Sequence, residues 1–147
     1  DWDIIAVEGA FLEAWLPSVF QRLEELAKLC RARNGSLGAW IEDKVSGTIL
    51  LQQARNRGWP AHSIDSKLTA LGKSERALNV SGYFHQGLFK ISDTAFEKTT
   101  TYRGTTRNHW LSQVTGFRVG TKDDQADDLL DTFTYGLAIA LGNPEGY

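Results

Sequence analysis

Two short acidic segments, far apart in the sequence, carry the residues best suited to chemistry. One is Ile41-Glu42-Asp43-Lys44, which closes an apolar run, and the other is residues 122–128, which precede an apolar helix. Acidic side chains three or four residues apart repel one another unless a cation neutralises them, and Mg²⁺ prefers such oxygen ligands. Two divalent ions about 3.5–4 Å apart are a known device for cutting phosphodiesters. The two segments therefore predict a site for Mg²⁺ or Mn²⁺.

Each segment also has a purely structural interpretation. Thr121 can be a helix N-cap, and acids in the first helical turn complement the helix dipole. This interpretation accounts for Asp123 and Asp124 better than for Asp127 and Asp128. For the first segment, the structural interpretation is a solvated loop in which the lysine neutralises the carboxylates. The presence of both segments in one chain favours the metal site.

The elements that must position these acids alternate in type. The sequence predicts strand, helix, strand, helix and strand over residues 2–8, 17–33, 37–41, 49–58 and 60–64. Such alternation predicts a parallel sheet covered by helices. Ligands bind such sheets at the carboxyl ends of the strands. Glu42 and Asp43 follow a strand at such an end, where an α/β protein usually holds its site.

The second half of the chain reads less regularly. The sequence predicts a short helix over 68–81, a strand pair over 82–92, and a mobile loop over 98–108. Arg103 and Arg107, set among threonines in this loop, are candidates for phosphate contacts, and a solvated loop without such contacts is an equal alternative. A short helix follows around Trp110. The last helix is predicted to start near Thr121, with a buried stripe at Leu130, Phe133, Leu137 and Leu141.

Composition and charge narrow the class of protein. The chain has 147 residues, 41% of them hydrophobic, and a net charge of −2. That length and composition predict one domain with a real core. Residues 51–120 carry ten basic and four acidic side chains, whereas residues 121–147 carry one basic and six acidic. A basic middle beside acidic clusters suits a protein that holds a polyanion near bound metal. The sequence predicts no membrane span, and the acidic residues near its start are not those expected of a signal peptide. The missing methionine suggests that Asp1 is not the natural start.

Several segments, taken in order, resemble the motifs of one known family. Ile41-Glu42-Asp43-Lys44-Val45-Ser46-Gly47-Thr48 resembles the Val-Glu-Asp-Lys-Ala-Ser-Gly signature of tailed-phage terminase large subunits. Lys73-Ser74-Glu75-Arg76-Ala77 resembles their Lys-x-x-Arg-Ala, and Asp123-Asp124-Gln125-Ala126-Asp127 resembles the Asp-Asp-Gln-x-Asp that closes their nuclease domain. Gly87-Leu88-Phe89-Lys90-Ile91 and Trp110-Leu111 are similar to two further stretches. The match covers residues 37–141, and its specificity comes from the ordered set.

The resemblance implies an RNase H-like fold, with a mixed sheet flanked by helices. It implies that residues 1–147 are a single nuclease domain that lacks its first strand, and that the ATPase domain is absent. The family's first metal ligand is an Asp on that first strand. Asp3 or Glu8 is a possible substitute here, but neither stands in the family's context.

The resemblance also implies a site and its roles. The enzyme would hold two Mg²⁺ or Mn²⁺ ions and cut double-stranded DNA. The catalytic residues would be Glu42 or Asp43 together with Asp124. The metal ligands are expected among Glu42, Asp43, Asp123, Asp124 and Asp127, with Asp124 favoured for the last ligand. The phosphates would be approached by Lys44, Lys73 and Arg76, besides Arg103 and Arg107.

The family's biology supplies the expected partners. They are concatemeric viral DNA, the terminase small subunit, the portal protein and the chain's own ATPase domain, all in the host cytoplasm. Two other functions remain open. One is another RNase H-like nuclease, such as a resolvase or transposase. The other is a non-catalytic packaging module that docks DNA, portal or small subunit.

Overall fold

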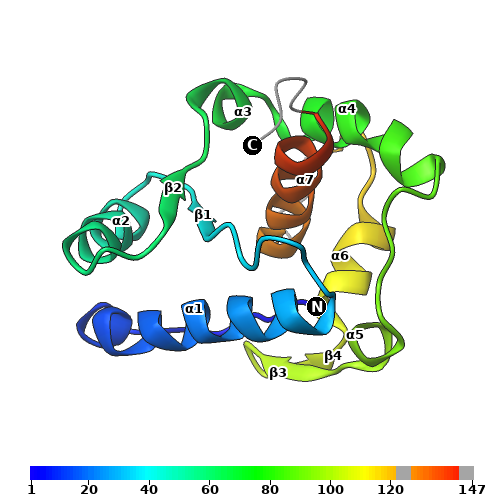
Figure 1. The fold of residues 1–147 in the computed structure, drawn as a ribbon. Helices are drawn as coiled ribbons and strands as arrows, with labels where there is room; N and C mark the ends of the chain where they lie inside the picture. The colour runs from blue at the N-terminus through cyan, green and yellow to red at the C-terminus, as the bar shows by residue number, and fades with distance from the viewer. Residues whose placement is uncertain (122–126, 143–147) are drawn as a thin grey trace. The chain divides into compact units, whose positions relative to one another are not determined.

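The computed structural model describes residues 1–121 and 127–142. The chain divides into two compact units. We call Val7–Thr69 the strand–helix–strand unit, and Asp1–Ala6 together with Ala70–Tyr147 the helical unit. Helices and two small sheets alternate along the chain (Figure 1), so the predicted α/β class is confirmed. In the described ranges, every helix is too short or too polar to cross a bilayer.

The strand–helix–strand unit is built around one parallel strand pair. A short 3-10 turn, η1 (Gly9–Phe11), leads into α1 (Leu12–Leu29), and β1 (Ala39–Ile41), α2 (Ser46–Asn56), β2 (Ala61–Ser63) and α3 (Ser66–Ala70) follow. β1 pairs with β2 in parallel, with Trp40 opposite His62. The crossover through α2 confirms the predicted strand–helix–strand alternation in residues 39–63. The acidic segment at 42–43 directly follows the carboxyl end of β1, as predicted.

The helix α1 begins earlier than predicted. Pro17 was expected in the first turn, but it lies inside the helix, which starts at Leu12. Leu12 and Leu16 are the buried residues of α1, and Leu16 is only 1% exposed. Burial of this apolar pair stabilises the turn that precedes Pro17. Pro17 is the sixth residue of α1, so it removes the hydrogen bond that residue 17 would donate to the Glu13 carbonyl.

The helical unit consists of helices and one antiparallel hairpin. Its elements are α4 (Lys73–His85), α5 (Asp93–Glu97), β3 (Thr100–Tyr102), β4 (Thr105–Arg107), α6 (His109–Gly116) and α7 (Asp128–Leu141). Both α4 and α6 pack against α7 (Figure 1). Aromatic side chains form much of the core: Phe133 of α7 meets Phe89 and Trp110 edge-on, with ring centroids 4.8 and 5.4 Å away.

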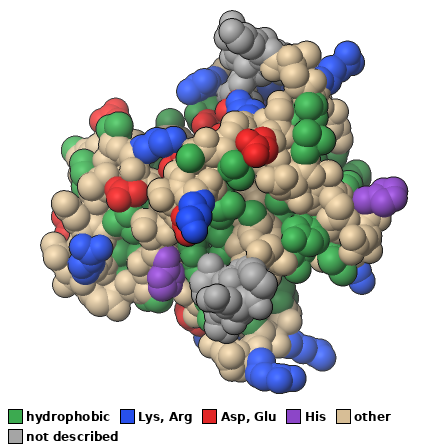
Figure 2. Space-filling view, turned by 90° about the horizontal axis from the view of Figure 1, so that it is seen from above, with side chains coloured by type: hydrophobic (Ala, Val, Ile, Leu, Met, Phe, Trp, Pro, Cys, Tyr) green, Lys and Arg blue, Asp and Glu red, His purple; other side chains and the backbone are tan. Residues whose placement is uncertain are grey.

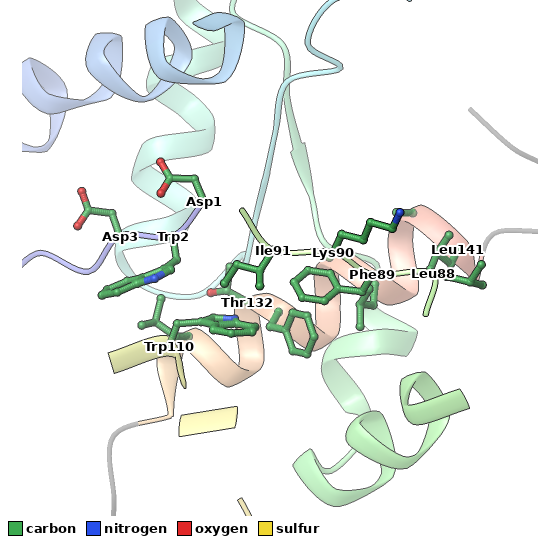
Figure 3. A pocket seen from close by; sticks show the side chains of 15 residues that line it. Asp1, Trp2, Asp3, Leu88, Phe89, Lys90, Ile91, Trp110, Thr132 and Leu141 are labelled. Atoms are coloured by element: carbon green, nitrogen blue, oxygen red, sulfur yellow. The ribbon is translucent and has the colours of Figure 1, made fainter. Parts of the chain in front are cut away.

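The predicted strand at residues 2–8 is wrong. Its residues pair with no strand in the part of the chain that the structure describes. Trp2 is instead a core side chain of the helical unit, 7% exposed, and its Nε1 donates to the Ala95 carbonyl at 2.8 Å. Trp2 and Trp110 line a pocket of about 540 Å³, and the carboxylates of Asp1 and Asp3 point away from their rings (Figure 3). Burial of one indole thus fixes this segment without a strand ladder.

Two predictions in the middle of the chain are also wrong. The strand pair expected over 82–92 is absent from the described structure, because α4 continues to His85 and Phe89 packs into the aromatic core. The loop expected over 98–108 is the hairpin β3–β4. Arg103 and Gly104 form its turn with φ values of 50° and 76°. Two successive positive φ angles are what a two-residue hairpin turn needs.

Each of the two sheets in the described residues has two strands. The described residues form a parallel pair, β1–β2, and an antiparallel pair, β3–β4. The coarse mixed α/β class therefore holds, and the RNase H-like arrangement stays a prediction. The last helix, α7, begins at Asp128, later than the predicted start near Thr121. Leu130 and Leu137 of its predicted stripe are buried, whereas Leu141 is 38% exposed.

Candidate metal and phosphate site

The first acidic segment lies in a tight loop between β1 and α2. The Lys44 N–H donates to the Glu42 carbonyl, and the Gly47 N–H donates to the Lys44 carbonyl, both at 2.9 Å. A Cβ at Gly47 would lie 1.8 Å from the Glu42 carbonyl oxygen, so only glycine fits there. Val45 has a φ of 46° and is 90% exposed. A β-branched residue in this region is strained, and strain of this kind concentrates at functional sites.

The two carboxylates of this loop have different surroundings. Glu42 is half-buried and accepts a hydrogen bond from Lys44 Nζ at 2.7 Å. Asp43 is exposed and accepts from Thr48 Oγ1 at 2.7 Å. Asp43 also borders a polar hollow of about 150 Å³ that includes Arg55. Lys44 thus neutralises Glu42, as the structural interpretation expected, and the choice between Glu42 and Asp43 as metal ligand stays a prediction.

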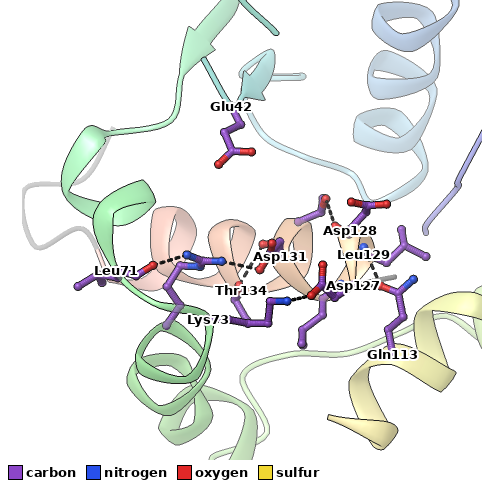
Figure 4. A network of polar contacts seen from close by, with 12 residues as sticks. Glu42, Leu71, Lys73, Gln113, Asp127, Asp128, Leu129, Asp131 and Thr134 are labelled. Carbon is purple, nitrogen blue, oxygen red and sulfur yellow. Dashed lines mark hydrogen bonds and ion pairs between the residues drawn. The ribbon is translucent and has the colours of Figure 1, made fainter. Parts of the chain in front are cut away.

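The second acidic segment is described from Asp127 onward. Asp127 is the residue before α7, but its side chain caps no N–H of the helix. Gln113 of α6 does so instead: its Oε1 accepts from the N–H groups of Leu129 and Leu130, at 2.8 and 3.2 Å. The Asp127 carboxylate is therefore not used as a cap. It forms an ion pair with Nζ of Lys73, the first residue of α4 (Figure 4).

A second cation–acid pair lies one helical turn further along α7. Arg76 is 7% exposed, and its Nη2 donates to Asp131 Oδ1 at 2.5 Å. Its Nη1 donates to the Leu71 carbonyl at 2.5 Å, and the guanidinium lies 4.6 Å from the ring centroid of Tyr135. These contacts fix Arg76 and orient Asp131. Arg76 thus acts as a positioning residue in this structure, and its predicted contact with DNA stays a prediction.

The structure brings together two motifs that are remote in sequence. Lys73 and Arg76, of the Lys-x-x-Arg-Ala motif, face Asp127 and Asp131 across the α4–α7 contact. Asp131 was not among the predicted ligands, although it stands four residues after Asp127 and so shares its face of the helix. That spacing is the sequence signal that could have added it. Gln113 carried no such signal, because its role depends on how α6 packs on α7.

The remaining predicted residues fall in three places. Asp123 and Asp124 lie outside the described residues. Lys44 is exposed beside Glu42. The first acidic segment belongs to the strand–helix–strand unit, whereas Asp127 belongs to the helical unit. The meeting of the two acidic segments on one cation therefore stays a prediction. Arg103 and Arg107 are exposed on the hairpin β3–β4.

The proposed substitutes for the first ligand lie apart from this loop in the sequence and differ in environment. Asp3 is exposed, and its Oδ1 lies 3.9 Å from Lys98 Nζ. The Glu8 carbonyl accepts from the Phe11 N–H in the turn before α1. Neither observation tests a metal-binding role.

The donor chemistry fits a hard divalent ion, but the described residues do not complete a site. Carboxylate oxygens such as those of Asp127 and Asp131 are the ligands that Mg²⁺ and Mn²⁺ prefer. Within residues 1–121 and 127–142, no group of three or more His, Cys, Asp or Glu side chains is arranged to hold a metal ion. Cationic side chains neutralise both acids here.

The surface charge is mixed rather than segregated on the face that Figure 2 presents. Basic, acidic and hydrophobic side chains are interspersed there. Comparison with known proteins adds no relative: no family model, no curated protein and no solved structure matches this chain. The terminase resemblance therefore rests on the sequence motifs and stays a prediction.

Proposed function

We propose that this chain is a metal-dependent endonuclease domain of the terminase large-subunit type, which cuts concatemeric viral double-stranded DNA during packaging. One observation carries the proposal. The Lys-x-x-Arg-Ala and Asp-Asp-Gln-x-Asp motifs, which the resemblance assigns to one site, are joined by the ion pair of Lys73 with Asp127, and Arg76 of the first motif pairs with Asp131, four residues beyond the second. A chance match of short motifs gives no reason for this proximity.

The residues would divide the work as follows. Glu42 or Asp43, with Asp124 and its neighbours Asp123 and Asp127, would supply the carboxylate oxygens that hold Mg²⁺ or Mn²⁺. When bound, two such ions stabilise the attacking and leaving oxygens of the phosphodiester and lower the pKa of water. Lys73 and Arg76 keep the acids at α7 in place by charge and hydrogen bonding.

The proposed biological setting follows from the same family. The DNA would be delivered by an ATPase domain of the full-length protein, with the small subunit and portal as partners in the host cytoplasm. A resolvase or transposase would share the metal chemistry, and specific nicking at branched DNA or transposon ends would favour it.

The test is digestion of supercoiled plasmid with Mn²⁺. We expect the native chain to convert supercoiled DNA to open-circular and linear forms, and EDTA to stop it. Asp124→Asn and Asp127→Asn should each lower the rate by at least about 100-fold, the scale of losing one charge-stabilising group at a reaction centre. Asp128→Asn is the matched control, because Asp128 is an exposed neighbouring acid on α7. Equal cleavage by all four proteins would overturn the assignment of the site.

A non-catalytic docking module is the second candidate, because Asp127 and Asp131 already have cationic partners. It predicts that DNA stays intact at every Mn²⁺ concentration while binding persists. The same digestion therefore separates the two functions.

A further inference from the structure

The hairpin β3–β4 lies in a stretch of sequence that has basic side chains and no acidic ones. Residues 98–120 contain no Asp or Glu, and their basic side chains are Lys98, Arg103, Arg107 and Arg118. The hairpin itself supplies two of these arginines, and both are exposed. An exposed element with arginines and no acids has the local charge that a polyanion requires.

The outer face of the hairpin presents hydroxyl groups. Thr101 pairs with Thr106 across the two strands, and their Oγ1 atoms lie 2.6 Å apart. Both threonines are exposed. At the turn, the Arg103 guanidinium lies 5.2 Å from the ring centroid of Tyr102, which holds the charge near the tip. Arginine forks and threonine hydroxyls are the usual donors to phosphate oxygens in protein–DNA contacts.

A buried histidine holds the hairpin in place. His109, at the start of α6, is 3% exposed, and its Nε2 lies 3.0 Å from the Thr100 carbonyl and 3.1 Å from the Thr105 carbonyl. Because carbonyl oxygens only accept hydrogen bonds, Nε2 carries the proton. Nδ1 then accepts from Arg107 Nε at 3.4 Å. One imidazole thus ties β3 to β4 and orients Arg107.

A hollow of about 470 Å³ runs beside β3. Its walls include Ile4 and Ile5 of the N-terminal segment and Thr101 and Arg103 of the hairpin. All of these residues belong to the helical unit. The hollow gives the turn an adjoining space that has apolar side chains on one side and the Arg103 guanidinium on the other.

From these observations we infer that the hairpin β3–β4 is a nucleic-acid backbone clamp. Arg103 at the turn and Arg107 bind phosphodiester oxygens. The Thr101–Thr106 pair, whose hydroxyls share one hydrogen bond, donates its remaining hydroxyl hydrogen from the face of the hairpin opposite Arg107. The inference rests on the proposed function for the choice of DNA, and it extends that function by naming an element that grips the substrate outside the metal ligands.

The experiment measures binding without cleavage. Fluorescence anisotropy of labelled duplex and of the same single strand would be recorded in EDTA over a range of NaCl concentrations. We expect Arg103→Gln/Arg107→Gln to weaken binding and to make the slope of log Kd against log[NaCl] shallower by about two, or about one per lost phosphate contact. Lys28→Gln/Arg33→Gln removes the same charge from exposed positions around the end of α1, and should leave the slope unchanged.

The outcomes are distinct from those of the plasmid digestion. A hairpin variant whose salt slope and affinity equal those of the native chain overturns the clamp, as does a native chain that binds neither DNA form. The DNA form that the native chain binds more tightly, duplex or single strand, is identified as the ligand. If the native chain binds DNA through the hairpin but does not cut plasmid in Mn²⁺, the proposed endonuclease is contradicted and the clamp is still supported.

Discussion

At the scale of single residues, burial changes the meaning of a motif. Arg76 reads from the sequence as a DNA contact, yet its side chain is only 8% exposed and is committed to Asp131 and the Leu71 carbonyl. Lys73, in the same motif, is 34% exposed at its side chain. A buried guanidinium is stabilised by partners within the protein, and here Nη1 and Nη2 have such partners, whereas Nε has none among the described residues. One residue of the motif therefore positions an acid, whereas the other remains within reach of a ligand.

The pairing of Arg76 with Asp131 predicts a large effect on stability. Arg76→Met should lower the free energy of unfolding by about 3 kcal/mol, because removing one partner of a buried pair leaves the other charge uncompensated. Arg76→Met/Asp131→Asn should recover part of that loss, since no unpaired charge remains. Urea unfolding measures both. If the double variant is no more stable than the single one, the pair does not explain the effect.

At the scale of elements, the side chains of one helix hold its neighbouring elements in place. Gln113 of α6 caps α7, and His109 at the start of α6 joins the two strands of the hairpin. These contacts arise because α6 lies between the hairpin and α7 in the chain and packs on α7. Helix α6 thus positions both the acidic start of α7 and the basic hairpin.

The role of His109 can be tested by rescue. His109→Ala should weaken DNA binding toward the level of Arg103→Gln/Arg107→Gln, because the hairpin loses the donor that holds Thr100 and Thr105. His109→Gln should restore binding, since a glutamine side-chain N–H can donate to the same carbonyls. Anisotropy reports the affinity, and thermal unfolding checks that both variants are folded. Equal binding by the alanine and glutamine variants would show that the hydrogen bonds are not what matters.

At the scale of the whole molecule, the residues that the proposal assigns to the metal are divided between the two compact units. Glu42 and Asp43 come from the strand–helix–strand unit, and Asp127 comes from the helical unit. An ion that binds the native state alone stabilises it by an amount set by its concentration relative to Kd. Chelation by both segments would therefore couple metal binding to the stability of the chain as a whole.

This coupling predicts a metal-dependent melting temperature. Mn²⁺ at about 100 times its Kd should stabilise the native chain by about 2.7 kcal/mol, and EDTA should reverse the shift. Glu42→Gln/Asp43→Asn should abolish the Mn²⁺-dependent rise, whereas Glu24→Gln/Glu25→Gln, at exposed positions on α1, should retain it. Differential scanning calorimetry measures the shift. An undiminished rise in the loop variant would remove Glu42 and Asp43 from the ligand set.

Features that depend on interactions between residues close in sequence were predicted correctly, whereas features that depend on tertiary contacts were missed. The alternation over 39–63 was predictable, because its signals are local: a short apolar run that ends at Ile41, and the glycine that permits the tight loop after β1. The hairpin was missed because Thr100, Thr101, Thr105 and Thr106 show no apolar alternation. Threonine nevertheless favours strands, and Arg103-Gly104 supplies the turn. The strand assigned to residues 2–8 failed because Trp2 is buried in the core of the helical unit.

The sequence by itself determined the α/β class, the position of Glu42 and Asp43 after a strand, and the order of the motifs. Each of these depends on residues close together in the chain. Tertiary structure alone decided that Lys73 meets Asp127, that Arg76 is buried against Asp131, and that Gln113 replaces Asp127 as the cap of α7. The physical reason is that helix packing decides which charges lose their water, and a charge that loses water must find its partner among residues remote in sequence.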